Sequence, residues 1–135
     1  MSPASPPSHQ GVVRGVEVRE SSGCSRVGRH VFDHWEYMAG QDEDRVCDLN
    51  SALGDPGVRA VIATRGGKGA YRIVDDLVVD DQRRDPKPSV GFSDITHLHP
   101  ALWERCGLAP VARTTSHAPP AAPEERTAGC GASTA

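Results

Sequence analysis

The segment that decides the fold is Lys-Pro-Ser-Val-Gly-Phe-Ser-Asp-Ile-Thr at residues 87–96. Residues 89–91 can form a short buried strand, and a run compatible with a helix extends from residue 94 to residue 106. Ser93 therefore stands at a turn between a strand and a helix, as the nucleophile does in a nucleophile elbow. The usual elbow pattern is Gly-x-Ser-x-Gly, and Ile95 replaces its second glycine. On this pattern alone, the favoured interpretation is that Ser93 only caps the helix.

A second strand-loop-helix unit precedes this segment and favours the elbow. Residues 58–63 are a β-branched apolar run, the loop Thr-Arg-Gly-Gly-Lys-Gly follows at 64–69, and a helix is predicted over 70–77. Glycines let backbone N–H groups approach a ligand without an intervening Cβ. The two units are close in sequence, so we expect parallel neighbouring strands with both loops at the carboxyl edge of one sheet, where open α/β folds place their sites.

The chain resembles the N-terminal domain of the LD-carboxypeptidases, serine peptidases of the murein tetrapeptide carboxypeptidase and microcin-immunity type. The motifs are Asp-Leu-Asn-Ser-Ala-Leu at 48–53, Val-Ile-Ala-Thr-Arg-Gly-Gly-Lys-Gly-Ala at 61–70, Pro-Lys-Pro at 86–88 and Gly-Phe-Ser-Asp-Ile-Thr at 91–96. Their order and spacing make the resemblance more specific than any one motif. It implies an α/β fold, a partial open parallel sheet with flanking helices, similar to Rossmann-like and class I amidotransferase-like domains.

The resemblance also implies a set of site residues. Ser93 matches the family's nucleophile, and the backbone N–H groups of Asp94 and Gly67 match its oxyanion hole. Gly66 and Arg65 are expected to contact substrate, with Arg65 steering a carboxylate by its charge and place. The family's catalytic Glu and His lie in a C-terminal domain that this sequence does not contain, so we expect the chain alone to be inactive.

The function implied is hydrolysis of the amide bond before a C-terminal D-amino acid in a murein peptide, through an acyl-enzyme, as in peptidoglycan recycling. The expected partner is a murein tetrapeptide-like substrate, and the intact family suggests a homodimer. No cofactor and no metal are implied. The alternative is a catalytically inactive remnant, or a module that binds a small ligand or phosphate.

Composition narrows the classes of protein to consider. The 135 residues are 37% hydrophobic and 4% aromatic, which is lean for a globular domain and indicates unstructured parts. A net charge of −3 with interspersed acids and bases argues against a nucleic-acid footprint or a basic membrane patch. No apolar run could span a bilayer and the first residues form no secretory signal, so we expect a cytoplasmic protein. The four cysteines have no Cys-x-x-Cys pairing and indicate free thiols.

The domain boundaries follow from local composition. Residues 1–10 are rich in Pro and Ser and are expected to be disordered, with the incomplete domain at 11–111. The first strand of the family is not found. Residues 112–135 are expected to be a disordered or non-native tail: a frame-shifted or truncated gene would give this composition, and so would an ordinary disordered tail.

Within the expected domain, helices are predicted at 11–22 and from residue 42 to residue 53, a strand at 26–32 and a helical turn at 80–84. The first of these segments is a helix by resemblance, since propensity leaves helix and strand close there. Pro100 interrupts the predicted helix after Ser93 and casts doubt on its straightness.

Three other interpretations of the site are weaker. The set Cys24, His30, His34 and Cys47 matches no compact zinc site. His97 follows Ser93 by four residues and could approach it as a base, but a surface or capping histidine is the simpler reading. The glycine loop lacks the Gly-x4-Gly-Lys-Ser/Thr pattern of a phosphate loop.

Overall fold

The computed structural model describes residues 1–20, 23, 25–107 and 111–112 and has the expected α/β architecture. Most of the predicted tail, residues 113–135, lies outside this range. The elements are helices α1 (His9–Glu20), α2 (Asp42–Gly54), α3 (Asp80–Arg84) and α4 (Leu98–Cys106), 3-10 helices η1 (Ala70–Ile73) and η2 (Ser93–His97), and strands β1 (Val61–Ile62), β2 (Ser89–Gly91) and β3 (Val111–Ala112). No helix of the described residues is long and apolar enough to cross a membrane.

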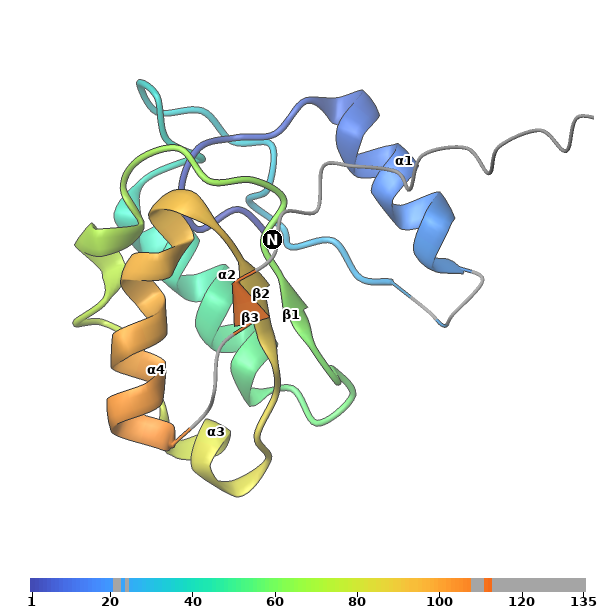
Figure 1. The fold of residues 1–135 in the computed structure, drawn as a ribbon. Helices are drawn as coiled ribbons and strands as arrows, with labels where there is room; N and C mark the ends of the chain where they lie inside the picture. The colour runs from blue at the N-terminus through green and yellow to red at the C-terminus, as the bar shows by residue number, and fades with distance from the viewer. Residues whose placement is uncertain (21–22, 24, 108–110, 113–135) are drawn as a thin grey trace, which may run out of the picture.

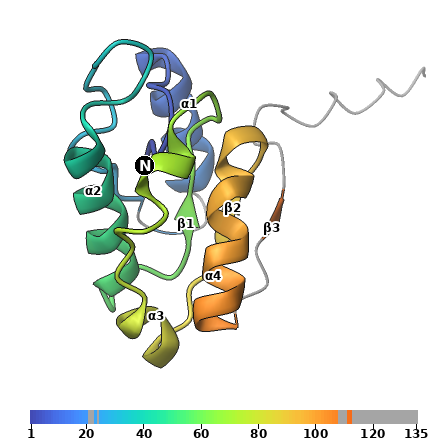
Figure 2. The same cartoon turned by 90° about the vertical axis from the view of Figure 1, so that its left-hand side faces the viewer.

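The three strands form one parallel sheet in the order β1-β2-β3. Val61 pairs with Ser89, and Val90 pairs with Val111. Helices α2 and α4 cover one face of this sheet, while α1 lies on the other side of the molecule (Figures 1 and 2). The parallel pairing of β1 with β2 confirms that the two strand-loop-helix units are neighbours. Their loops therefore emerge at the same edge.

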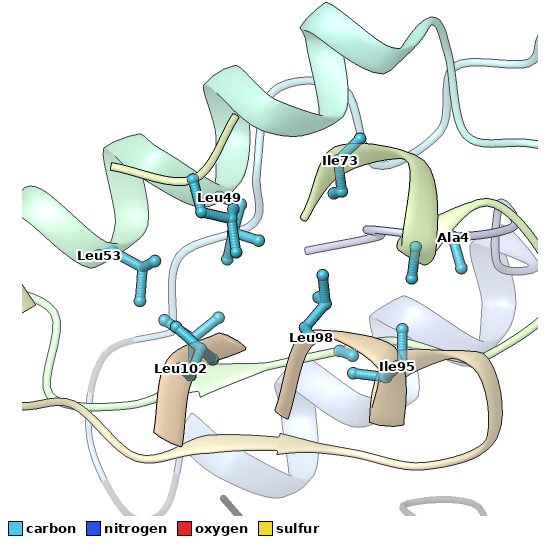
Figure 3. Close-up of a cluster of buried hydrophobic side chains, with 11 residues drawn as sticks. Ala4, Leu49, Leu53, Ile73, Ile95, Leu98 and Leu102 are labelled. Atoms are coloured by element: carbon cyan, nitrogen blue, oxygen red, sulfur yellow. The ribbon is translucent and has the colours of Figure 1, made fainter. Parts of the chain in front are cut away.

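The core lies between the sheet and the two covering helices (Figure 3). Leu49 and Leu53 stand one helical turn apart on α2 and point toward the interior, which is why this stretch forms an amphipathic helix. Leu98 and Leu102 repeat the spacing on α4 and face them. Truncating one such leucine to alanine typically costs about 2–5 kcal/mol. These contacts fix the distance between α2 and the segment that follows β2.

The N-terminal segment corrects the expectation that residues 1–10 are disordered. Ala4 is completely buried in the core, and its carbonyl accepts a hydrogen bond from the Ala39 N–H at 2.9 Å. The Met1 ammonium group donates to the Ile62 carbonyl at 3.2 Å, and the Thr64 N–H donates to the Met1 carbonyl at 2.9 Å. Small side chains let this Pro- and Ser-rich segment pack closely along β1. Residues 1–10 thus belong to the domain, which was expected to start at residue 11.

Two predicted elements differ from the structure. Residues 26–32 contain turns and no strand, since the Asp48 carboxylate accepts the backbone N–H groups of Arg29 and His30 at 3.0 Å and holds them in a turn. The helix predicted over 70–77 is shortened to η1. The helices at 42–54 and 80–84 form as predicted.

Pro100 does not kink α4. The chain leaves β2 as the 3-10 helix η2, and α4 begins only at Leu98. Pro100 is therefore in the first turn of α4, where backbone N–H groups have no partner within the helix.

Candidate functional site

Ser93 occupies a strained turn at the carboxyl end of β2. Phe92 is extended, with φ −148° and ψ 175°, and Ser93 then adopts a φ of +58°. A non-glycine residue with positive φ is uncommon, and such residues persist where the surrounding structure holds them, often at functional sites. Ser93 is also exposed. The turn thus presents a hydroxyl to solvent at the edge of the sheet, as a nucleophile elbow does.

The structure does not support the interpretation of Ser93 as a helix cap. The N-cap residue of η2 is Phe92, and no side chain caps this helix. Ser93 is the first residue of η2, and its carbonyl accepts a hydrogen bond from Thr96 Oγ1 at 2.5 Å. The Ser93 hydroxyl is left available for chemistry.

The glycine loop, residues 64–69, lies directly against Ser93. A Cβ on the buried Gly66 would stand 2.8 Å from the Ser93 Cβ, closer than real Cβ atoms come, and 3.1 Å from the Phe92 carbonyl oxygen, which is also tight. Glycine is therefore required at Gly66 by close approach. The predicted adjacency of the two loops is confirmed. The backbone N–H groups of Gly67 and Asp94 belong to these two adjoining segments.

Ser5 reaches the same loop and was missed by sequence reasoning. Its backbone N–H donates to the Gly66 carbonyl at 3.4 Å, and its hydroxyl oxygen accepts the Lys68 N–H at 3.3 Å. A side chain on Gly67 would collide with Ser5. No local pattern in the sequence signals this contact, because it joins residues more than 60 positions apart.

Asp94 connects the elbow to the far end of the glycine loop. Its Oδ2 accepts the backbone N–H of Ala70 at 2.7 Å, and its side chain is only 9% exposed. Its Oδ1 lies 3.7 Å from His97 Nε2. Residues three apart share a face of a 3-10 helix, so His97 aligns with Asp94 and not with Ser93. The structure therefore gives no support to His97 as the base.

Arg45 holds the other side of the loop from within the core. The guanidinium is completely buried and donates to the carbonyls of Gly69 at 2.9 Å and Pro3 at 2.8 Å. It is also paired with Asp42, whose carboxylate accepts a hydrogen bond from Arg72 at 2.7 Å. Burial acts to raise the pKa of Asp42, but the hydrogen bond from Arg72 and the charge of Arg45 hold it below its usual value.

Arg65 is exposed, and its guanidinium donates to the Pro6 carbonyl at 3.4 Å. It is thus in the loop that meets Ser93, beside the N-terminal segment. A role in binding a substrate carboxylate stays a prediction.

Aromatic and cationic side chains lie around the two loops. The Lys68 ammonium is 5.8 Å from the centroid of the Tyr37 ring, and the Tyr71 ring meets the His97 ring edge-on at 6.1 Å. Contacts of this kind hold exposed side chains in place by cation-π attraction and ring quadrupoles.

The residues once considered as a zinc set do not assemble as one. His30 Nδ1 lies 2.7 Å from Asp33 Oδ2, and the hydrogen bond that the ring makes to the Asp33 carboxylate raises the pKa of His30. Cys47 and Cys106 are free thiols. Cys47 is exposed, while Cys106 is partly buried, and this burial raises its pKa. Cys24 lies outside the described residues. Of the candidate zinc set, His30 forms an ion pair with Asp33, a residue outside the set.

Comparison with known proteins places this geometry in a family. The LD-carboxypeptidase N-terminal domain matches residues 1–113. A Streptomyces coelicolor protein that bears the name of a carboxypeptidase is 43% identical over 112 residues, covering 82% of this chain and 34% of that protein. The murein tetrapeptide carboxypeptidase of Pseudomonas aeruginosa is 38% identical over 105 residues, covering 74% of this chain and 34% of its own length.

The same fold is found in solved structures. The microcin C7 self-immunity protein MccF, in complex with aspartyl sulfamoyl adenosine, superposes with a TM-score of 0.73 at 25% identity, covering 80% of this chain and 33% of MccF. The chain thus spans about a third of the length of these relatives.

Proposed function

Because the chain belongs to the LD-carboxypeptidase family, we propose that it carries the nucleophile and oxyanion hole of a serine peptidase that cleaves murein peptides. The bond cleaved would be the amide before a C-terminal D-amino acid. The observation that supports this most is Ser93 itself, which is exposed at φ +58° with Gly66 packed against it. A cytoplasmic location, a part in peptidoglycan recycling and a homodimer of the intact protein are further parts of the proposal, carried by the family resemblance.

In the proposed reaction, Ser93 Oγ attacks the carbonyl carbon of the scissile amide. A C–O bond forms, the carbonyl oxygen becomes an oxyanion, and the serine proton passes to a base. The N–H groups of Gly67 and Asp94 would stabilise the oxyanion, and each such donor contributes about 3 kcal/mol in serine hydrolases. Collapse of the intermediate breaks the C–N bond and releases the D-amino acid, whose amine takes up the proton. Water then hydrolyses the ester on Ser93.

The base is the part of this mechanism that the described residues do not supply. None of the histidines or carboxylates in residues 1–20, 23, 25–107 and 111–112 hydrogen-bonds the Ser93 hydroxyl in the structure. A serine hydroxyl is a weak nucleophile at neutral pH without such a base. We therefore propose that this chain alone has low turnover, and that a Glu and a His of the kind its longer relatives use are needed for full activity. A catalytically inactive remnant is the alternative.

The test is release of D-alanine from a murein tetrapeptide by the purified chain, compared with a Ser93→Ala variant. The proposal predicts little release by the chain alone, because a serine hydrolase without its base keeps only the small acceleration that the oxyanion hole and binding give. Rapid release at the same rate from both proteins would show that Ser93 is not the nucleophile. Rapid release dependent on Ser93 would show that a base is already present in this chain.

A further inference from the structure

One peptide bond in the glycine loop is held at both ends by buried charged side chains. The carbonyl of Gly69 accepts a hydrogen bond from Arg45 Nη1 at 2.9 Å. The N–H of the same peptide unit, that of Ala70, donates to Asp94 Oδ2 at 2.7 Å. The Arg45 side chain is completely buried and the Asp94 side chain is 9% exposed. A cation thus binds the oxygen end of this peptide and an anion binds its N–H end.

This arrangement matches the dipole of the peptide group. The oxygen carries the negative partial charge and the N–H the positive one, so both ends face charges of opposite sign. Hydrogen bonds to ionised groups are shorter and about twice as strong as neutral ones. Gly69 has a φ of +105°, a conformation that only glycine adopts readily. The two charged groups therefore fix the orientation of a peptide that the backbone itself would leave free.

The same two side chains connect this peptide to the elbow and to the N-terminal segment. Asp94 directly follows Ser93, so the position of its carboxylate is coupled to the position of the elbow. Arg45 comes from α2 and also donates to the Pro3 carbonyl at 2.8 Å, two residues before Ser5. The loop that packs against Ser93 is thereby held to three separate parts of the chain.

We propose that Arg45 and Asp94 are positioning residues that hold the glycine loop against Ser93. This inference rests on the proposed function, because positioning matters only if Ser93 reacts. Neither side chain is assigned to contact substrate. They act through the loop, since displacement of an oxyanion donor by about 1 Å can reduce a rate about a hundredfold.

The experiment measures how fast a fluorophosphonate modifies Ser93 in the full chain, by intact mass spectrometry. In this reaction Ser93 Oγ forms a bond to phosphorus, the P–F bond breaks, fluoride leaves, and the serine proton goes to solvent. The phosphoryl oxygen takes the place of the carbonyl oxygen in the oxyanion hole. We expect Asp94→Ala and Arg45→Met each to slow labelling about tenfold or more, because the Gly69–Ala70 peptide loses one of its two charged hydrogen-bond partners.

Conservative variants separate positioning from folding. In Asp94→Asn the amide oxygen can still accept the Ala70 N–H, so labelling should stay within about threefold of the unmodified chain. Lys87→Met is the matched control: Lys87 is also a buried cation bound to a backbone carbonyl, that of Leu53 at 2.7 Å, but it lies just before the amino end of β2 and does not bind the glycine loop. We expect this variant to be less stable and to be labelled at the unmodified rate.

A second readout does not depend on reactivity. The Ala70 amide proton should exchange slowly with solvent in the unmodified chain and rapidly in Asp94→Ala, because its acceptor is removed. Rapid exchange of Ala70 in the unmodified chain would overturn the inference, even if a variant fails to fold. Labelling of Asp94→Ala and Arg45→Met at the unmodified rate would also overturn it. Equal labelling of the unmodified chain and Ser93→Ala would instead contradict the proposed function. Ala70 exchange would still report whether Asp94 binds the Ala70 N–H.

Discussion

At each end of the sheet, a buried cationic side chain donates hydrogen bonds to backbone carbonyls, but the two cations stabilise different kinds of structure. At the carboxyl end, the buried Arg45 donates to the carbonyls of Gly69 and Pro3 and so holds loops. At the amino end, the buried Lys87 donates to the Leu53 carbonyl in the last turn of α2, a turn that has no basic residue of its own. A cation there satisfies a free carbonyl and complements the negative end of the helix dipole.

The two ends also differ in backbone strain, which is concentrated at the carboxyl end of the sheet. At the amino end the cation completes a regular helix. At the carboxyl end the charged groups hold backbone in unusual conformations, with Gly69 at φ +105° and Ser93 at +58°. Positive φ at a non-glycine residue is unfavourable by about 1–3 kcal/mol and persists only where the surroundings impose it. Changes at the two ends should therefore have different consequences for labelling and for stability.

Among variants that keep Ser93, the largest effect on reactivity is expected for Gly66→Ala. The new Cβ would stand 2.8 Å from the Ser93 Cβ and 3.1 Å from the Phe92 carbonyl, so loop and elbow must move apart. We expect fluorophosphonate labelling of Ser93 to fall about a hundredfold, and the free energy of unfolding to fall by about 1–3 kcal/mol.

The matched control for this prediction is Gly15→Ala in α1. An added Cβ there meets nothing within 4 Å, so the chain should gain about 0.5–1 kcal/mol from better helix propensity and keep its labelling rate. Equal labelling of Gly66→Ala and Gly15→Ala would mean that the glycine loop does not shape the elbow.

The next largest effect is expected for Lys87→Met, and it is an effect on stability. The variant leaves the Leu53 carbonyl without its donor and the Asp85 carboxylate without a 2.9 Å ion pair. Urea denaturation should show a loss of about 1–3 kcal/mol. The pKa of Asp85, which the hydrogen bond from Lys87 lowers, should rise toward its usual value. A loss of Ser93 labelling as large as in Gly66→Ala would contradict the separation of the two ends.

A smaller effect, of the opposite sign, is expected for Ser93→Gly. Glycine adopts positive φ without steric cost, so this variant should be more stable by about 1 kcal/mol while it abolishes labelling. The same replacement at Ser51, exposed on α2, should lower stability by about 0.5–1 kcal/mol. Loss of stability in both variants would show that the turn at Ser93 is not strained.

The smallest effects concern two histidines whose pKa values shift in opposite directions. The hydrogen bond that the His30 ring makes to the Asp33 carboxylate raises the pKa of His30. The folded state therefore binds the proton more tightly, and this stabilisation is complete below the unfolded pKa of about 6.5 and is lost as pH rises through the folded pKa. Urea denaturation across this range should show that His30→Gln removes this decline. A decline that persists in His30→Gln would assign it to another group.

The pKa of His99 shifts in the opposite direction, to below its usual value. Its side chain is 7% exposed, its Nε2 has no hydrogen-bond partner among the described residues, and burial lowers its pKa. The folded state favours the neutral ring, so its stabilisation is present above the unfolded pKa of about 6.5 and is lost as pH falls. His99→Leu should remove this loss in denaturation curves measured on the acid side. An unchanged acid profile would show that His99 does not titrate on unfolding.

The sequence predicted the elbow because its determinants are local. A short apolar strand, a turn residue and a helical run lie within a few residues of each other at 89–98, and the glycine loop follows β1 in the same way. Parallel pairing of adjacent units then brought Ser93 to Gly66. The same reasoning predicted α2, whose leucines repeat at helical spacing.

The contacts that hold the site together could not be predicted in this way. Arg45 reaches Gly69 across 24 positions, and Ser5 reaches Lys68 across 63. These side chains bind backbone groups, which carry no sequence signal. The disorder predicted for residues 1–10 is wrong for a related reason: the composition resembles a linker, and contacts with β1, Arg45 and the glycine loop stabilise the segment.

The most direct test of the account is the site of modification in the chain after prolonged exposure to a fluorophosphonate, determined by peptide mapping. The account predicts the label on Ser93 alone, with Ser2, Ser5 and Ser8 unmodified in the same sample as internal controls. An exposed hydroxyl in a strained turn beside backbone donors should react before any other serine. Label spread over several serines, or a labelled residue other than Ser93, would contradict it.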